Sequence, residues 1–167
     1  MKILWAPWRM KYVQDTLQPR RGECIFCVAA KAREDEKYYV VYRSKHSYVI
    51  LNKYPYNTGH VMVVPHRHVS CITALEDNEL LDLSKTITVA IRALREAFRP
   101  DGFNVGANIG RDAGAGIEDH FHVHIVPRWR GDTNFMPIVS ETKVLPQLLD
   151  DTYRILKKAF SSVTKTE

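Results

Sequence analysis

Residues 120–126 read HFHVHIV, an alternation of histidine with apolar residues that no other part of the chain repeats. In a β-strand, successive side chains point to opposite faces of the sheet. The stretch therefore predicts a strand that buries its apolar residues on one face and aligns His120, His122 and His124 on the other. Such a strand needs neighbouring strands and a covering layer, so this segment decides the fold.

The spacing of the three histidines leaves three interpretations open. They could belong to a surface strand with no special role, hold a metal ion, or provide a nucleophile with two supporting rings, since imidazole is largely neutral near physiological pH. The segment upstream favours catalysis on an anion. Asn108 precedes the glycine-rich stretch 110–116, and backbone N–H groups in such loops can approach a phosphate closely.

The remaining segments predict an α+β fold with an antiparallel sheet. A helix from about Leu75 to Phe98 keeps its apolar residues on one face. Thr73 and Glu76 resemble a capping box at its start, and Pro100 follows its end. Further strands are predicted at 38–43, 48–52, 60–64 and 103–109, and further helices at 28–33 and about 145–160.

The charge of the chain favours anionic partners. The formal net charge is +5 and the 24 Lys and Arg residues are spread along the sequence, so we expect a mixed-charge surface and no nucleic-acid patch. No apolar run approaches a membrane span and no apolar signal core follows Met1, so neither a membrane partner nor secretion is expected. Three cysteines are too few for a secreted disulfide framework, and they predict a cytoplasmic protein.

The histidine stretch resembles the signature of the histidine triad (HIT) superfamily, in which three histidines alternate with apolar residues. The similarity extends upstream to Asn52 and to residues 59–68, GHVMVVPHRH, and it covers about residues 24–129. The resemblance implies a HIT-like α+β fold with a five-stranded antiparallel sheet, a long helix and a C-terminal helix, and a homodimer whose sheets join. It also implies an N-terminal extension (1–22), a HIT domain (23–130) and a C-terminal segment (131–167) with a helix packed on the same domain.

The resemblance also assigns roles to single residues. His122 would attack the α-phosphorus of a nucleotide and form a covalent nucleotidyl-histidine, His124 would contact the phosphate or the leaving group, and His60 and His120 would orient the other rings. Trp129 could stack on a purine base, or it could fill a core or an interface as tryptophans more often do. Contacts with ribose or phosphate are implied for Asn52, Asn108, Gly114, Ala115 and Gly116.

A closer resemblance is to bacterial diadenosine tetraphosphate phosphorylases, at residues 4–12 (LWAPWRMKY) and 127–135 (PRWRGDTNF). It implies a dinucleoside polyphosphate substrate, inorganic phosphate as co-substrate, and ADP and ATP as products. Hydrolases of the superfamily carry Gln and Ser or Thr where Ala115 and Gly116 stand here, with one residue fewer before the triad, so the hydrolase resemblance is weaker. Water as the acceptor, acting on dinucleoside polyphosphates or nucleoside phosphoramidates with release of AMP, stays open, and so does a nucleotide-binding module without turnover. The uridylyltransferase branch has Gln at the third histidine, so His124 argues against it.

Cys24 and Cys27 have the spacing of metal ligands, but one such pair is half a site. A redox dithiol or two buried thiols are the alternatives that the spacing leaves open. Some members of the superfamily complete the site with histidines that match His68 and His120, which implies a structural zinc ion held by two cysteines and two histidines. No organic cofactor is implied.

Overall fold

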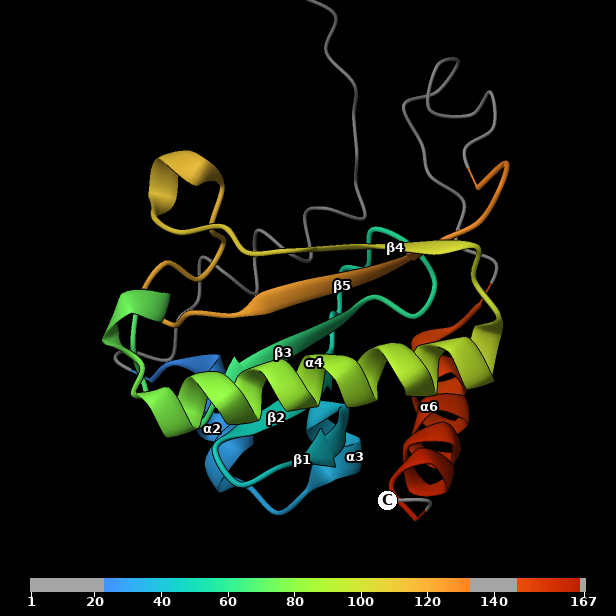
Figure 1. Ribbon diagram of the computed structural model, residues 1–167, viewed down its shortest axis with the longest axis horizontal. Helices are drawn as coiled ribbons and strands as arrows, with labels where there is room; N and C mark the ends of the chain where they lie inside the picture. Colours follow the sequence, from blue (N-terminus) through green and yellow to red (C-terminus); the bar gives the residue numbers. More distant parts are fainter. Residues whose placement is uncertain (1–22, 133–146, 166–167) are drawn as a thin grey trace, which may run out of the picture.

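A computed structural model describes residues 23–132 and 147–165. Its centre is an antiparallel sheet of five strands in the order β1-β2-β3-β5-β4, which confirms the predicted fold class (Figure 1). The predicted dimer is not part of this structure and stays a prediction. The strands are β1 (Val40–Arg43), β2 (Ser47–Leu51), β3 (Val61–Pro65), β4 (Gly102–Gly106) and β5 (Val123–Arg128).

Helices cover both faces of the sheet. The long helix α4 lies across β2, β3 and β5, and α6 packs against α4 and β1. Among the described residues, none of the helices combines the length and apolar character that crossing a bilayer requires. The α-helices are α2 (Ile25–Lys31), α3 (Asp35–Tyr38), α4 (Asp77–Phe98) and α6 (Leu149–Val163), and two short 3-10 helices are η1 (Ile72–Ala74) and η2 (Arg111–Ala113).

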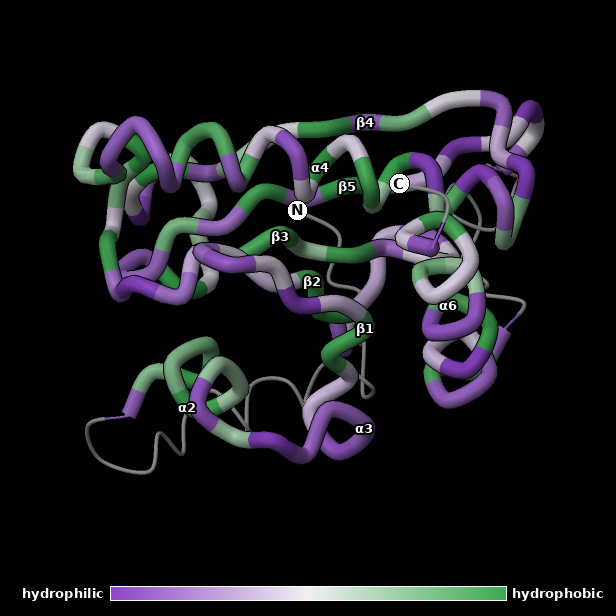
Figure 2. Tube along the Cα trace, turned by 60° about the horizontal axis from the view of Figure 1, so that its bottom comes forward, coloured by the Kyte–Doolittle hydropathy of each residue, from purple (hydrophilic) through white to green (hydrophobic). Residues whose placement is uncertain are grey.

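Alternation along the strands divides the core into two clusters. Val49, Val63 and Ile125 point to the face that α4 and α6 cover. Tyr48 and Met62 point to the other face, where they meet Phe26 and Ala29 of α2. Figure 2 shows α2 and α4 on opposite sides of β2 and β3. The histidine-bearing face of β5 is therefore the face that α2 covers.

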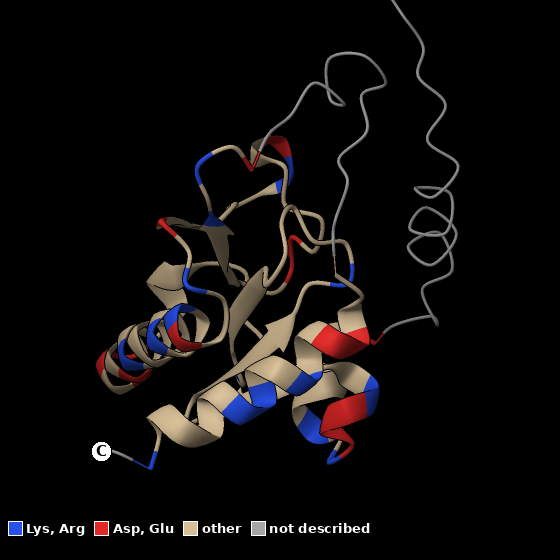
Figure 3. Cartoon of the chain, turned by 90° about the vertical axis from the view of Figure 1, so that its right-hand side faces the viewer, with Lys and Arg blue, Asp and Glu red and all other residues tan. Residues whose placement is uncertain are grey.

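Charged side chains lie mainly outside the sheet. In the view of Figure 3, Lys, Arg, Asp and Glu colour the helices and connecting loops, while the central strands carry few of them. Several of these charges pair across elements, as Lys157 of α6 does with Asp35 of α3 at 3.0 Å. This distribution agrees with the mixed-charge surface expected from the sequence.

The start of α4 differs from its prediction. The N-cap is Glu76, whose side chain accepts from the backbone of Glu79, and the Glu79 carboxylate accepts from the Glu76 N–H at 2.8 Å. The predicted capping box of Thr73 with Glu76 is therefore wrong. Thr73 lies in η1 and donates its hydroxyl hydrogen to Cys71 Sγ, which leaves the helix to begin one short turn later.

Three strand predictions were too long, and the one over 38–43 overlapped α3, since β1 begins only at Val40. β4 ends at Gly106 and is largely exposed, whereas we expected a half-buried strand over 103–109. β5 begins at Val123, so His120 and His122 precede it. The register of β3 with β5 would bring Pro65 opposite Phe121, and proline has no N–H for the ladder. The Phe121 N–H donates instead to the Val69 carbonyl at 2.6 Å.

Gly59, directly before His60, allows a prediction about stability. Its φ of +76° lies in the left-handed region, and an added Cβ would stand 3.0 Å from two ring carbons of Phe98 at the end of α4. We expect Gly59→Ala to lower the free energy of unfolding by about 2–3 kcal/mol, because strain and overlap add. Thermal unfolding should show a drop in Tm of about 4–12 °C. Gly102→Ala, with nothing within 4 Å of the added carbon, is the control, and an equal drop in that variant would contradict the prediction.

Candidate functional site

His122 is held in one tautomer by the backbone beside it. Its Nδ1 lies 2.8 Å from the carbonyl oxygen of His120, and since a carbonyl accepts, Nδ1 carries the proton. The lone pair of the neutral ring is therefore on Nε2. The side chain is buried, with 4% of the residue exposed, and this burial lowers the pKa of His122 and favours the neutral form. A neutral imidazole with a free Nε2 lone pair is a nucleophile.

His60 and His124 form a second oriented pair next to it. The N–H of Tyr56 donates to His60 Nδ1 at 3.1 Å, so the proton of a neutral His60 is on Nε2. That Nε2–H donates to His124 Nδ1 at 2.9 Å, which leaves the proton of His124 on its own Nε2. Burial, helped by neighbouring imidazoles, lowers the pKa of His60 to about 3 and that of His124 to about 4. Both rings are neutral near physiological pH, and His124 has an N–H to offer.

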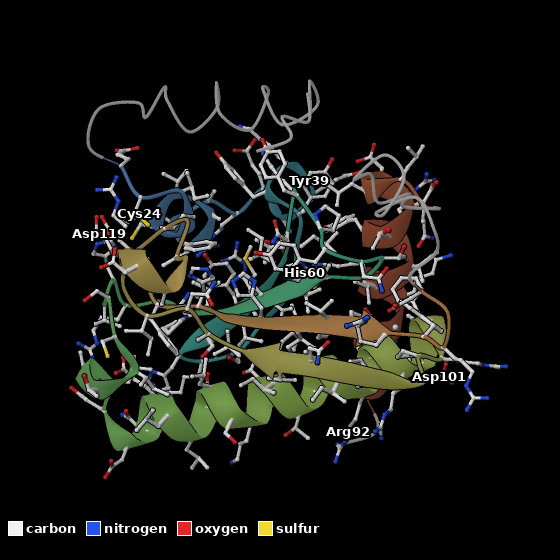
Figure 4. The ribbon with its side chains drawn as sticks, turned by 90° about the horizontal axis from the view of Figure 1, so that it is seen from above. Cys24, Tyr39, His60, Arg92, Asp101 and Asp119 are labelled. Atoms are coloured by element: carbon white, nitrogen blue, oxygen red, sulfur yellow. The ribbon has the colours of Figure 1, made fainter. Side chains whose placement is uncertain are left out.

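The rings of His122 and His124 lie against each other, with centroids 4.8 Å apart. A ring with a free lone pair and a ring with a free N–H therefore stand side by side. Tyr56 covers the second pair, with its ring centroid 4.6 Å from His60 and 5.9 Å from His124, and it is more than half exposed. In Figure 4, His60 lies near the middle of the molecule, and Cys24 and Asp119 lie toward one end.

His120 lies on the same face as His122, as the alternation predicts, since Phe26 contacts both rings, but its ring faces a separate group of side chains. Its ring is fully buried, and Nε2–H donates to the Pro65 carbonyl at 2.9 Å. Nδ1 then has a free lone pair, and it faces Cys24 Sγ at 3.3 Å and Cys27 Sγ at 3.6 Å. The alternation of faces continues upstream of β5, because Phe121 lies in the same core cluster as Val123 and Ile125.

Four donor atoms come together around His120. His68 Nδ1 lies 3.2 Å from His120 Nδ1 and 3.3 Å from Cys27 Sγ, and the donors of Cys24, Cys27, His68 and His120 all lie within 4.8 Å of one another. Tetrahedral zinc, with bonds of about 2.0–2.3 Å to nitrogen and sulfur, separates its ligands by about 3.3–3.8 Å. Four contacts between these atoms, at 3.2–3.6 Å, are near that separation. The His120 hydrogen bond to a carbonyl is the kind that fixes a metal-binding imidazole. These four residues can hold a metal ion.

The glycine-rich stretch forms a closed loop. Asn108 Nδ2 donates to the Gly114 carbonyl at 3.3 Å, and Gly110 and Gly114 adopt φ values of +85° and +86° that suit glycine. Ala115 is half-buried and Gly116 exposed in this loop. β4 ends at Gly106, which pairs with His124, and Asn108 follows two residues later in the direction of His122. The loop therefore leads toward the end of the sheet that carries His122.

Asn52 and Trp129 each have hydrogen-bond partners inside the protein. Asn52 Nδ2 lies 3.3 Å from His60 Nδ1, the ring nitrogen that does not face His124. The Oδ1 of Asn52 accepts the Tyr54 N–H at 2.9 Å. The Trp129 indole donates to the Phe98 carbonyl at 3.3 Å, at the end of α4 on the other face of the sheet. Trp129 is therefore not brought to the histidines. Trp5, Trp8, Asn134 and Phe135 lie outside the described residues.

Sequence reasoning missed two side chains at the site. Phe26 packs against both His120 and His122, with ring centroids 5.4 Å and 5.0 Å away, and Tyr56 covers His60 and His124. The position of Phe26 between Cys24 and Cys27 was a usable signal. If these two cysteines bind a metal together with His120, the residues between them must also lie close to His120. Tyr56 had no comparable signal.

Comparisons with known proteins agree with this geometry. The family model described as HIT domain matches residues 33–131. A Mycobacterium tuberculosis protein named AP-4-A phosphorylase is 46% identical over 161 residues, covering 93% of this chain and 83% of that protein. An asymmetrical bis(5'-nucleosyl)-tetraphosphatase of Schizosaccharomyces pombe is 37% identical over 93 residues, covering 56% of this chain and 50% of that protein. The crystal structure of a Zn-bound histidine triad family protein from Mycobacterium smegmatis has a TM-score of 0.70 and 25% identity, covering 87% of this chain and 98% of that one.

Proposed function

The chain belongs to the HIT domain family, and on that premise we propose that it cleaves a dinucleoside polyphosphate through a covalent nucleotidyl intermediate on His122. One observation carries the proposal. The Nδ1–H of His122 is committed to the His120 carbonyl at 2.8 Å, which leaves the lone pair of Nε2 for attack on phosphorus. The neutral His124 ring next to it, which carries its hydrogen on Nε2, supports the same proposal because it can donate to the leaving oxygen.

The reaction proceeds as two displacements on one phosphorus. Nε2 of His122 forms a bond to the α-phosphorus while the bond to the leaving nucleotide oxygen breaks, and the Nε2–H of His124 hydrogen-bonds that oxygen. An acceptor oxygen then attacks the same phosphorus, and the N–P bond breaks. His122 recovers its lone pair, so each cycle returns the ring to its starting state. Fixed donors stabilise the negative charge that builds up on the phosphoryl oxygens.

Those donors are assigned to the loop and to the rim of the site. Asn108 and the backbone N–H of Gly116 are assigned to phosphate oxygens. The N–H groups of Gly114 and Ala115 already donate to the carbonyls of Arg111 at 2.9 Å and Gly110 at 3.4 Å, so these two would have to exchange their partners to bind phosphate. Asn52 contacts the ribose through the second N–H of its amide and the second lone pair of Oδ1, since its contacts with His60 and Tyr54 use one of each. Trp129, on the other face of the sheet, is left out of the proposed site.

Inorganic phosphate is the acceptor that we favour, so the products from diadenosine tetraphosphate are ADP and ATP. Attack by phosphate on the adenylyl group of His122 gives ADP, and the leaving nucleotide is ATP. The relative named AP-4-A phosphorylase supports this choice, and so do Ala115 and Gly116, which bring no side-chain hydrogen bond to the acceptor position. The tetraphosphatase relative keeps hydrolysis, with AMP as product, as the second candidate.

The metal cluster and the assembly complete the proposal. Zinc at Cys24, Cys27, His68 and His120 would tie α2 to the segment that precedes β5, and its role is structural. We further propose a cytoplasmic homodimer with joined sheets, an N-terminal extension at 1–22, a HIT domain at 23–130 and a C-terminal segment at 131–167.

Product analysis tests the choice of acceptor. With diadenosine tetraphosphate and inorganic phosphate, we expect ADP and ATP in equal amounts, and without phosphate we expect the steady-state rate to fall at least about 100-fold, since the intermediate lacks its acceptor. Anion-exchange chromatography separates the products. AMP and ATP formed at the same rate with or without phosphate would identify a hydrolase and contradict phosphorolysis.

A further inference from the structure

We propose that Phe26 is a positioning residue for His122, because its ring sets the orientation in which Nε2 meets the phosphorus. The inference rests on the proposed function of His122 as the nucleophile. Phe26 is 1% exposed, so it acts through its contacts with the imidazole and not through contact with the substrate.

The imidazole of His122 needs such a support. A single hydrogen bond from Nδ1 to the His120 carbonyl fixes the tautomer and restrains the ring, but it leaves some freedom in the side-chain torsions χ1 and χ2. Two rings limit this motion: Phe26, with centroids 5.0 Å apart and planes at 52°, and His124, at 4.8 Å and 72°. Loss of the Phe26 ring would remove one of the two ring contacts that His122 makes among the described residues.

Phe26 is itself fixed from several directions. Its carbonyl accepts the Tyr48 hydroxyl at 2.8 Å, inside the cluster between α2 and the sheet. Cys24 and Cys27, on either side of it in sequence, belong to the metal cluster, and its ring also contacts His120 at 5.4 Å. Arg43 holds the other end of α2 by donating at 2.8–2.9 Å to the carbonyls of Ala29, Ala30 and Ala32.

The consequence is a link between the metal cluster and the reacting nitrogen. The cysteines of the metal cluster lie at one end of α2 and Arg43 binds the other end. Between them, α2 places the Phe26 ring against the His122 ring. A small displacement of a reacting group can lower a rate by about 100-fold. Because Phe26 acts on the nucleophile alone, its truncation should lower kcat and leave KM nearly unchanged.

The experiment compares Phe26→Leu with Phe160→Leu in the full chain. Phe160 of α6 is 2% exposed and stacks on Tyr42 in the other core cluster, so it is a buried phenylalanine away from the histidines. Both variants should lose a few degrees in Tm, about equally. Phe26→Leu should lower kcat and the single-turnover rate of His122 nucleotidylation by about 10- to 100-fold, with KM within about twofold. Phe160→Leu should keep both rates. Phe26→Met, which fills the volume without a flat face, should act in the same direction if Phe26→Leu folds poorly.

Two further readouts separate positioning from a general structural effect. Loss of the Phe26 ring current alone shifts nearby NMR signals, so the readout is the set of NOEs between the ring protons of His122 and His124, which should change in Phe26→Leu and stay the same in Phe160→Leu. Metal content should equal that of the wild type. Wild-type kcat in Phe26→Leu, an equal loss in Phe160→Leu, or full recovery of Phe26→Leu by added zinc would overturn the inference. If the wild type itself forms no adduct on His122 during turnover, the proposed function fails instead.

Discussion

His122→Ala is expected to lower kcat by about 10,000-fold or more, because the variant has no atom to form the bond to phosphorus. The neighbouring imidazoles cannot replace it. The lone pair on Nδ1 of His124 already accepts from His60, and Nδ1 of His120 faces the cysteines. Steady-state assays with diadenosine tetraphosphate and phosphate measure the loss, and covalent labelling of the variant should be absent.

The fold should survive this substitution. The Nδ1 hydrogen bond of His122 goes to the adjacent segment of its own chain, and the four residues of the metal cluster are untouched. Circular dichroism and metal content should therefore match the wild type. His46→Ala, another histidine replaced outside the site, is the control and should keep full activity. Turnover of His122→Ala at more than a few per cent of the wild-type rate would show that another group is the nucleophile.

The second large effect concerns the metal cluster. Cys27→Ser is expected to lower the metal content sharply and to reduce the free energy of unfolding by about 3 kcal/mol, because a metal ion held by the four residues would join α2 to His68 and His120. Differential scanning calorimetry should show a Tm lower by about 6–12 °C. A chelator added to the wild type should produce a similar shift, which zinc reverses.

Cys71→Ser is the matched control for this experiment. Cys71 is a free cysteine near the start of η1, and the metal cluster does not include it. Its replacement should leave Tm and metal content nearly unchanged. Equal behaviour of the two variants, or a Cys27→Ser protein with the stability of the wild type, would contradict a structural metal site.

The sequence predicted what depends on local periodicity. The alternation in 120–126 correctly indicated the buried face of β5, since Val123 and Ile125 lie in the core under α4. The three- and four-residue spacing of apolar residues located α4 within two residues at its start. Both patterns arise because one face of an element must leave water, and that requirement is visible in the order of the residues.

What the sequence could not predict depends on where separate segments meet. His120 Nδ1 lies 3.3 Å from Cys24 Sγ, a contact between segments far apart in the chain that strand alternation does not predict. The tautomer of His124 is fixed by Tyr56 through His60, a relation between backbone and rings that no spacing rule describes. Trp129 lies at the end of α4, where its indole N–H donates to the Phe98 carbonyl.

The most direct measurement is a trapping experiment on the wild-type protein. The enzyme is mixed with diadenosine tetraphosphate labelled at the α-phosphorus without inorganic phosphate, quenched in alkali, digested and mapped by mass spectrometry. We expect one adenylyl group, bound to Nε2 of His122, with ATP released in the same amount and the label lost in acid. Label on a different residue, or continued turnover in phosphate with no labelled protein, would contradict nucleophilic attack by His122.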